Sequence, residues 1–291
     1  MMWYSRLDNI FNQSTIVNSK WVPMSIEAML MIALGVFFVA FTFAPVGMGG
    51  GMLFVPLLHY GAGWAIDGRT IAVSLILTCI VSYGSGLAHR QKGYVDDVVV
   101  KTGLIGAIPG ALVGVFIVSL IGSHMDTVFK ILSLGMILWA IWKTAVKKKS
   151  TASEEQERDV EIQTLPLQIG SGIGGALSSV LAIGAGVIYV PIIRTFAHLR
   201  PRMAIGSSLH LMMAVIPVSI LAHLVIQPAD ALNQLLGDSP FILSLGLLTF
   251  IGARSGAHFG IKHVSEERIM LVFLVLIIIV AVRYIVDLTG L

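Results

Sequence analysis

The amino-acid sequence predicts an all-α, polytopic membrane protein with about ten membrane segments in two inverted five-segment repeats. First, the 291-residue chain is 56% hydrophobic and only 12% charged, whereas a soluble domain is about 25% charged. Second, apolar runs of about 20 residues, the length that crosses a bilayer, recur throughout the chain. Third, a glycine-rich stretch interrupts an apolar run in each half of the chain.

The apolar runs divide the chain into four parts. The expected parts are a periplasmic N-terminal tail (1–22), a first membrane repeat (23–146), a cytoplasmic linker (147–164) and a second membrane repeat (165–291). The expected membrane segments are residues 25–44, 51–63, 70–88, 102–121, 128–146, 165–183, 187–199, 203–226, 240–260 and 268–288. The second and seventh segments are too short to cross about 30 Å of hydrocarbon, so each is expected to begin inside the bilayer as a half-helix.

The positions of Lys and Arg support this segment count and set its orientation. If the N-terminus lies outside, all but five of the 19 basic residues fall on the cytoplasmic side. The five exceptions are Arg6, Lys20, Arg69, Lys130 and Arg283. Because short cytoplasmic loops carry an excess of Lys and Arg, we expect both termini to be periplasmic and residues 147–164 to be cytoplasmic.

The two halves resemble each other in sequence. The stretch "GGGMLFVPLL" (49–58) aligns with "GAGVIYVPII" (184–193). With a gap of one residue, Ser74 then aligns with Ser208, Ser85 with Ser219 and His89 with His223. Five segments per half is an odd number, so the second half must cross in the opposite sense, as in many secondary transporters.

Each half also carries a ladder of glycines spaced by four residues. The ladders are Gly106, Gly110 and Gly114 in "GAIPGALVG", and Gly252, Gly256 and Gly260 in "GARSGAHFG". Small residues at this spacing let two membrane helices approach closely. We therefore interpret the ladders as packing surfaces, with a direct substrate role as the alternative.

The glycine breaks indicate a binding place for a small anion. Half-helices that begin near Gly51 and Gly186 would present unpaired N–H groups and a partial positive charge near the middle of the bilayer. Glycine at Gly49, Gly50 and Gly184 would let a ligand approach the backbone itself. The alternative is that these glycines only permit a tight helix crossing.

Polar side chains on the following segments are candidates to line the same place. Ser74, Thr78, Ser82 and Ser85 form one hydroxyl stripe at helical spacing, and Ser207 and Ser208 lie in the second copy. For any single serine, a bond to its own helix is the alternative. His210 is a candidate pathway residue or a packed histidine. Arg194 and Arg254 are candidates to guide anions along the inner vestibule. The alternative is that their charged side chains only extend to the lipid headgroups.

Several classes of function are disfavoured. No acidic residue falls in the middle of a segment, which argues against a cation site. A single cysteine, Cys79, and no Cys/His cluster give no reason to expect a metal or cofactor. The net charge of +3 is too small to predict a nucleic-acid partner. The sequence contains no GxxxxGK[ST] motif, so we do not expect ATP-driven pumping by this chain. No nucleophile with a nearby base, and no metal cluster, is expected within the membrane segments, so we do not expect an enzyme.

These motifs, in this order, resemble the sulfite exporter TauE/SafE family. The resemblance rests on "GMGGGMLFVPLL", "GAGVIYVPII", "AHRQKGYVD", "GAIPGALVG" and the closing "IGARSGAHFGIKHVSEERIMLVFLVLIII", and covers residues 25 to 288. It implies a bacterial inner-membrane permease for sulfite, sulfonates, thiosulfate or related organic anions. By position it carries over the break at Gly47 and Gly49–Gly51 with Pro56, and its second copy at Gly184, Gly186 and Pro191.

The expected function is therefore secondary transport, most readily the export of a sulfonate or sulfite by alternating access. A passive anion channel and an importer of a small carboxylate or sulfur anion are the alternatives. The expected partners are the small anion and the lipid bilayer, with a homodimer left open.

Overall fold

The structure is a computed structural model that describes residues 25–47, 50–147, 162–263 and 266–290. All regular secondary structure in these ranges is helical. The expected tail (1–22), most of the expected linker, and Gly49 of the first break lie outside the described residues.

Each of the ten expected segments corresponds to a helix. In the first half these are α2 (Ile26–Phe43), α3 (Gly51–Ala62), α4 (Gly68–Gln91), α5 (Asp97–Ile121) and α6 (Met125–Lys147), with 3-10 turns η1 (Ala44–Val46) and η2 (Gly122–His124). In the second half they are α7 (Thr164–Leu181), α8 (Ala185–Phe196), α9 (Pro201–Ile226), α11 (Ser239–His263) and α12 (Glu266–Thr289). A further short helix, α10 (Ala229–Gly237), was not expected from the apolar runs.

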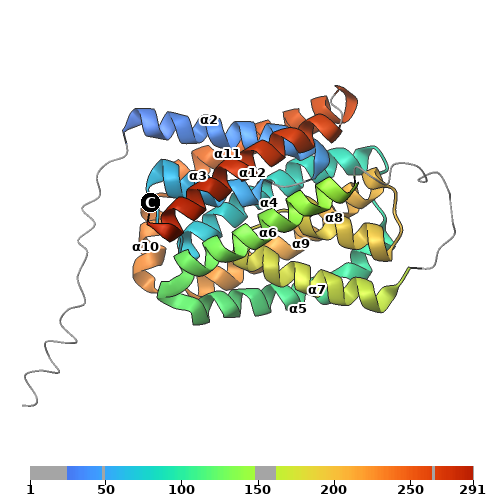
Figure 1. The fold of residues 1–291 in the computed structure, drawn as a ribbon, viewed down its shortest axis with the longest axis horizontal. Coiled ribbons are helices and arrows are strands. Elements are labelled where there is room, and N and C mark those ends of the chain that lie inside the picture. Colours follow the sequence, from blue (N-terminus) through green and yellow to red (C-terminus); the bar gives the residue numbers. More distant parts are fainter. Residues whose placement is uncertain (1–24, 48–49, 148–161, 264–265, 291) are drawn as a thin grey trace, which may run out of the picture.

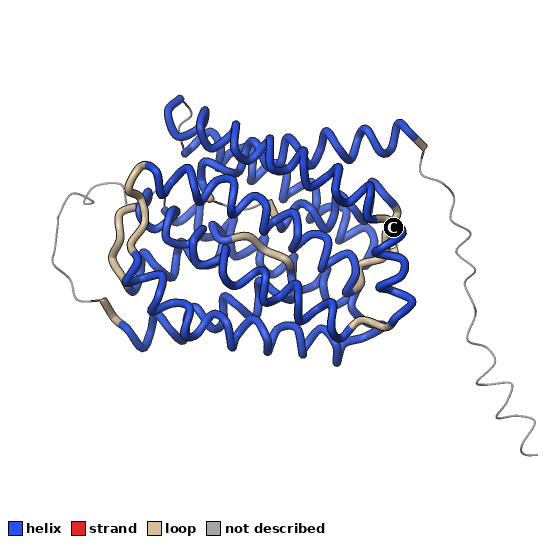
Figure 2. The backbone as a smooth tube through the Cα atoms, turned by 180° about the vertical axis from the view of Figure 1, so that it is seen from behind, coloured by secondary structure: helices blue, strands red, loops and turns tan. Residues whose placement is uncertain are grey.

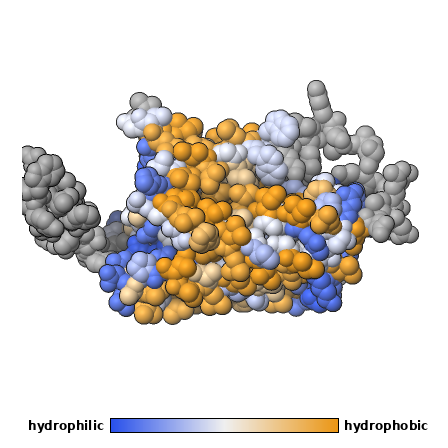
Figure 3. Space-filling view, turned by 90° about the horizontal axis from the view of Figure 1, so that it is seen from below, coloured by the Kyte–Doolittle hydropathy of each residue, from blue (hydrophilic) through white to orange (hydrophobic). Residues whose placement is uncertain are grey.

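The helices form a polytopic membrane protein. Six helical stretches in the described residues are long and apolar enough to cross a bilayer, and α3 and α8 are shorter apolar helices of 12 residues each. In the space-filling view, hydrophobic side chains cover the middle of the visible face and hydrophilic ones gather at its two ends (Figure 3). This pattern fits a hydrocarbon belt between two wet surfaces.

The helices lie side by side in one bundle. The start of α2, the first described helix, and the C-terminus lie at the end of the bundle opposite to the start of α7 (Figure 1). Seen from behind, most loops lie at these two ends, and one further loop segment lies within the middle (Figure 2). Helix α5 packs along α7, α11 along α2, α4 against α9, and α6 against α12.

Both glycine ladders are packing surfaces, as predicted. A Cβ atom on Gly106, Gly110 or Gly114 would meet the α7 backbone at residues 168, 172 and 176 in turn. A Cβ atom on Gly252 or Gly256 would meet the α2 backbone at Phe37 or Phe41, and one on Gly260 would meet Pro45. The rising numbers on both sides show that each pair runs parallel, with one helix from each half.

Polar residues set the starts of several helices. The Ser25 hydroxyl accepts a hydrogen bond from the Ala28 N–H at 3.2 Å, and the Asp67 carboxylate accepts one from the Thr70 N–H at 2.9 Å. The Asp96 carboxylate accepts bonds from two N–H groups of the first turn of α5, at 2.9 and 3.0 Å. These caps satisfy N–H groups that have no partner within the helix.

Candidate functional site

The first break lies between α2 and α3. Helix α2 ends at Phe43 and continues into η1, which contains Pro45. Gly47 and Gly50 both adopt left-handed backbone angles, with φ values of 68° and 70°. Because a side chain in this region is strained, glycine is the residue that these two positions favour. Helix α3 then begins at Gly51.

The second break lies between α7 and α8 and is built differently. Helix α7 ends at Leu181, and Ala182 adopts a left-handed conformation with φ 51° and ψ 29°. Gly184 is extended (φ −76°, ψ 172°) and precedes α8, whose first turn contains Gly186. In the alignment of the two halves, Ala182 stands where the first half has Gly47. The backbone therefore adopts a left-handed conformation at equivalent positions of the two halves, at a glycine in the first and at an alanine in the second.

The two breaks touch each other. A Cβ atom on Gly51 would coincide with the backbone carbonyl oxygen of Ala182, and would lie 2.7 Å from the Thr78 hydroxyl. The start of α3 therefore lies directly against the end of α7, with α4 beside both. On the other side, a Cβ atom on Gly50 would lie 2.7 Å from the Val39 side chain and 3.0 Å from Phe54. Close approach of the Ala182 backbone thus accounts for Gly51, whereas the left-handed backbone and two neighbouring side chains account for Gly50.

The hydroxyl stripe of α4 is buried beside this crossing. Ser74 donates to the Gly51 carbonyl at 3.4 Å, so it contacts the first turn of α3. Thr78 and Ser82 donate to carbonyls of their own helix four residues earlier, at 2.8 and 2.9 Å. Ser85 donates to the Ala44 carbonyl at 2.5 Å. Two of the four hydroxyls therefore reach across to the break, and two bond within α4.

The corresponding residues of α9 are arranged less uniformly. The Ser208 hydroxyl donates to the Ile205 carbonyl at 2.8 Å, and Ile205 and Leu209 pack against Gly47 of the first break. The Ser207 hydroxyl instead accepts a hydrogen bond from the Asp96 N–H at 2.9 Å, in the loop before α5. The structure thus brings Gly50, Gly51, Ser74 and Thr78 together, whereas Ser207 holds a connecting loop.

The three remaining candidates lie on other parts of the bundle. One nitrogen of His210, Nδ1, lies 3.0 Å from the Gly206 carbonyl, and Nε2 is buried with no hydrogen-bond partner among the described residues. Arg194 is half-buried in the last turn of α8. Arg254 is half-buried on α11, and its backbone packs beside Gly84 of α4.

Each break is held by a serine and a histidine of a central helix. In the first half, Ser85 bonds the Ala44 carbonyl and His89 bonds the Pro45 backbone. In the second half, His223 Nε2 lies 3.0 Å from the Ser179 carbonyl, and the Ser179 and Ser219 hydroxyls are 2.7 Å apart. These contacts satisfy carbonyls that a helix end leaves without a partner. They give the aligned Ser and His pairs a structural role.

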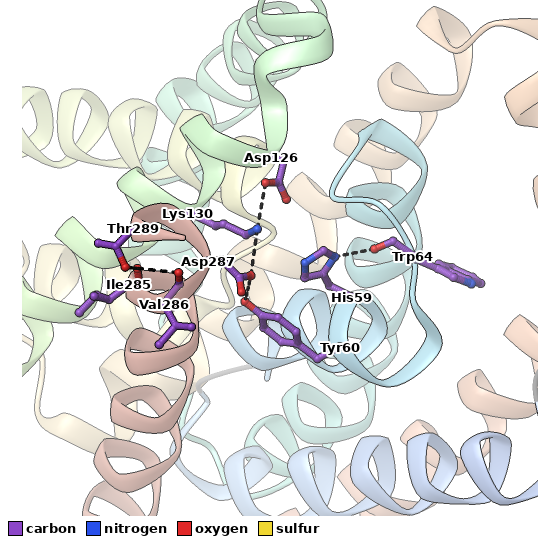
Figure 4. Close-up of polar contacts among 9 residues, drawn as sticks. All are labelled: His59, Tyr60, Trp64, Asp126, Lys130, Ile285, Val286, Asp287 and Thr289. Atoms are coloured by element: carbon purple, nitrogen blue, oxygen red, sulfur yellow. Dashed lines mark hydrogen bonds and ion pairs between the residues drawn. The ribbon is translucent and has the colours of Figure 1, made fainter. Parts of the chain in front are cut away.

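One polar cluster was missed at the sequence level. The buried Lys130 of α6 lies 2.9 Å from the Asp126 carboxylate and 3.1 Å from that of Asp287 (Figure 4). Tyr60, near the end of α3, donates to the same Asp287 oxygen at 2.7 Å. The four-residue spacing of Asp126 and Lys130 was a visible signal. The contact with Asp287 was not, since it joins distant parts of the chain.

Across the described ranges, no group of three or more His, Cys, Asp or Glu side chains is placed to hold a metal ion. The groups around the breaks are hydroxyls, backbone amides and carbonyls, and histidines that bond to carbonyls.

A family model described as "Sulfite exporter TauE/SafE" matches residues 32–284, nearly the whole chain. The chain belongs to the sulfite exporter TauE/SafE family. Its membership agrees with the motifs at both breaks, which lie inside the matched range.

Two curated relatives support a transport role for this TauE/SafE protein. A "Probable membrane transporter protein" of Xylella fastidiosa is 29% identical over 188 residues, which cover 64% of this chain and 70% of the relative. The "Probable membrane transporter protein YunE" of Bacillus subtilis is 26% identical over 254 residues, covering 80% of this chain and 89% of the relative. No solved structure matches the chain. The protein is thus a membrane transporter of the TauE/SafE family.

Proposed function

We propose that this TauE/SafE protein is a secondary transporter that exports a small oxyanion, a sulfonate or sulfite, across a bacterial inner membrane by alternating access. The observation that carries the proposal is the contact between the two helix breaks at Gly51 and Ala182. Broken helices that meet at membrane depth are the usual place for substrate in transporters of this kind. The hydroxyls of Ser74 and Thr78 lie directly beside this contact.

The packing of the helices supports an inverted repeat. The pair α5 and α7 has its counterpart in α11 and α2, and the contact of α4 with α11 has its counterpart in that of α9 with α5. The pairs α4 and α9, and α6 and α12, each join equivalent helices of the two halves. Such reciprocal contacts are expected when the halves are related by a pseudo-two-fold axis in the membrane plane.

The charge distribution favours an anion. The acidic residues of the described ranges lie in loops, in first turns or, for Asp287, near the end of the last helix. Cation and proton sites in membranes usually contain carboxylates near the middle of the bilayer. The first turns of α3 and α8 instead offer N–H groups and a partial positive charge. The Ser74 and Thr78 hydroxyls beside α3 donate to backbone carbonyls in this structure, and exchanging those bonds for an anion would suit a compact group with several acceptor oxygens.

The family description supports sulfur in the substrate, and the charge distribution supports export as the direction of transport. The description of the matching family names sulfite export. Most Lys and Arg residues fall on the side that we assign to the cytoplasm, where they would gather anions. A membrane potential that is negative inside drives an anion outward, by about 2.3 kcal/mol per charge for each 100 mV.

Transport in proteoliposomes tests this function. Vesicles with purified protein are loaded with labelled sulfite, sulfoacetate, thiosulfate or acetate, and release is followed with and without an inside-negative potential. We expect saturable release of a sulfur oxyanion that the potential accelerates and that external substrate exchanges. Release that neither saturates nor exchanges would indicate a passive channel. Movement of acetate alone would contradict the sulfur assignment, and release that ignores the potential would contradict electrogenic export.

The orientation needs its own test. In a Cys79→Ser background, single cysteines at Asn233 of α10 and at Gln91 of α4 lie at opposite ends of the bundle, and both positions are exposed. An impermeant maleimide added to whole cells should label position 233 and spare position 91. The opposite labelling would place both termini in the cytoplasm.

A further inference from the structure

The two breaks differ in polarity at equivalent positions. In the first half, Phe43, Ala44 and Phe54 are fully buried around the break. The aligned residues of the second half are Ser178, Ser179 and Tyr189, which are also buried. Three apolar side chains in one repeat thus correspond to three hydroxyl groups in the other. The Ser179 hydroxyl is used in the contact with Ser219, so Ser178 and Tyr189 remain to be explained.

The Tyr189 hydroxyl is buried without a partner. Tyr189 has 0% exposure, and its oxygen has no hydrogen bond to any residue that the structure describes. The Ser178 hydroxyl interacts with the Tyr189 hydroxyl from beyond normal hydrogen-bond geometry, and it also makes a 4.0 Å contact with the Met212 sulfur. Gly174 leaves room for the ring, since a Cβ atom there would lie 3.0 Å from Tyr189 Cε1. A buried hydroxyl without a partner is costly and unusual in a folded protein.

Packing does not require this hydroxyl. Phe54 occupies the same position of the first repeat, in the third residue after Gly51, and is equally buried. Phenylalanine fills the same volume as tyrosine apart from one oxygen, and would remove the unsatisfied group. The second repeat therefore keeps a donor that its fold does not need, close to the start of a half-helix.

We propose that the hydroxyls of Tyr189 and Ser178 donate hydrogen bonds to the transported oxyanion, so that the substrate rests against the second break and not midway between the two. This inference rests on the proposed function and adds its donors and its asymmetry. The two hydroxyls lie on α8 and α7, one turn from the break on either side. A sulfonate or sulfite offers several charged acceptor oxygens, which form stronger bonds with such donors than neutral acceptors do.

Binding to purified protein tests the proposal with three variants. Tyr189→Phe removes the donor, Ser178→Ala removes its neighbour, and Phe54→Tyr is the matched control at the equivalent position. Affinities for sulfite and sulfoacetate are measured by calorimetry, and the melting temperature is measured without ligand. We expect Tyr189→Phe to weaken binding about 10-fold to 100-fold, the loss expected for one bond to a charged group. Its melting temperature without ligand should be equal to the wild-type value or higher.

The possible results distinguish a failure of this inference from a failure of the proposed function. Unchanged affinity in both Tyr189→Phe and Ser178→Ala would overturn the inference while leaving the proposed function intact. A lower melting temperature together with unchanged affinity would assign Tyr189 to packing and would also overturn it. Absence of anion binding in the wild-type protein would instead overturn the proposed function. Ser178→Ala alone still decides the question if Tyr189→Phe does not fold, because it should weaken binding in the same direction.

Discussion

The break before α3 and the break before α8 use different residues for the same change of direction. The first places glycine at Gly47 and Gly50, the left-handed positions among its described residues. The second has an alanine, Ala182, at the position that aligns with Gly47, and an extended glycine, Gly184, two residues later. The aligned residues also differ in polarity: Phe43, Ala44 and Phe54 at the first break correspond to Ser178, Ser179 and Tyr189 at the second. The comparison indicates a well-satisfied first break and a strained, polar second break.

The C-terminal ends of the two short helices, α3 and α8, also differ in their polar contacts. Helix α3 is tied to α6 and α12 through Tyr60, Asp287 and Lys130 (Figure 4). The second half has Thr195 at the position of Tyr60, and its hydroxyl bonds only within α8, to the Pro191 carbonyl at 2.8 Å. Beside it lies an apolar groove of about 390 Å³ between α6, α7 and α8. We therefore expect α3 to be the more firmly held of the two half-helices.

The largest expected effect follows from separating the two breaks. Gly51→Leu places a side chain where the Ala182 carbonyl lies, and both neighbours are backbone or buried. We expect a loss of about 3 kcal/mol or more, because backbone cannot shift as a flexible side chain does. Gly135→Ala on the exposed face of α6, where a Cβ atom meets nothing within 4 Å, is the control and should be neutral or slightly stabilising. Melting curves in detergent that coincide for both variants would contradict the crossing.

The next effect tests the left-handed glycine of the first break. Gly47→Ala combines the strain of a left-handed alanine with a methyl group 2.7 Å from Ile205 Cγ2. The expected loss is about 2–4 kcal/mol. Gly63→Ala has a similar φ of 69° but open space around the new methyl, so it should lose only about 1–2 kcal/mol. Equal losses would show that Ile205 adapts and that packing at Gly47 is unimportant.

The polar cluster at the end of α3 gives a smaller effect. Lys130→Met leaves the carboxylates of Asp126 and Asp287 without their shared cation. Removing one partner of a buried pair costs about 3–5 kcal/mol, but both carboxylates are partly exposed, so we expect about 1–3 kcal/mol. Thr195→Ala at the equivalent end of α8 should change the unfolding free energy by less than about 0.5 kcal/mol. If the two variants melt alike, α3 is not the more firmly held helix.

The serines that hold the breaks should differ as well. Ser85→Ala leaves the Ala44 carbonyl without its hydroxyl donor and should cost about 1–2 kcal/mol. Ser219→Ala should cost about 0.5–1 kcal/mol, because His223 still bonds the Ser179 carbonyl. Thermal melts of the two single variants, measured side by side, check the order. A larger loss for Ser219→Ala would mean that the hydroxyl pair and not the histidine holds the second break.

The sequence predicted what long apolar runs and glycines encode. The expected half-helix at 51–63 corresponds to α3 at Gly51–Ala62, because the glycines stop one helix and a new apolar run starts the next. Helix α10 was missed since nine residues with mixed polarity carry no membrane signal. The pairing of Lys130 with Asp287 and the contact of Gly51 with Ala182 depend on tertiary packing, which a pattern along one chain does not contain. The left-handed conformation of Ala182 could not be predicted, because alanine rarely adopts it.

The smallest expected effect concerns that alanine. Ala182→Gly relieves a left-handed conformation that costs an ordinary residue about 1–2 kcal/mol. The same change removes a fully buried methyl group, worth about 0.8 kcal/mol, and gives the unfolded chain more freedom, worth about 0.5–1 kcal/mol. The opposing terms nearly cancel, so the melting temperature should stay close to the wild-type value. A loss similar to that of Gly47→Ala would mean that the Ala182 methyl is essential to the packing of the second break, and that strain there is negligible. A near-zero change, beside a large loss for Gly47→Ala, would show that strain at the second break is offset by burial of that methyl.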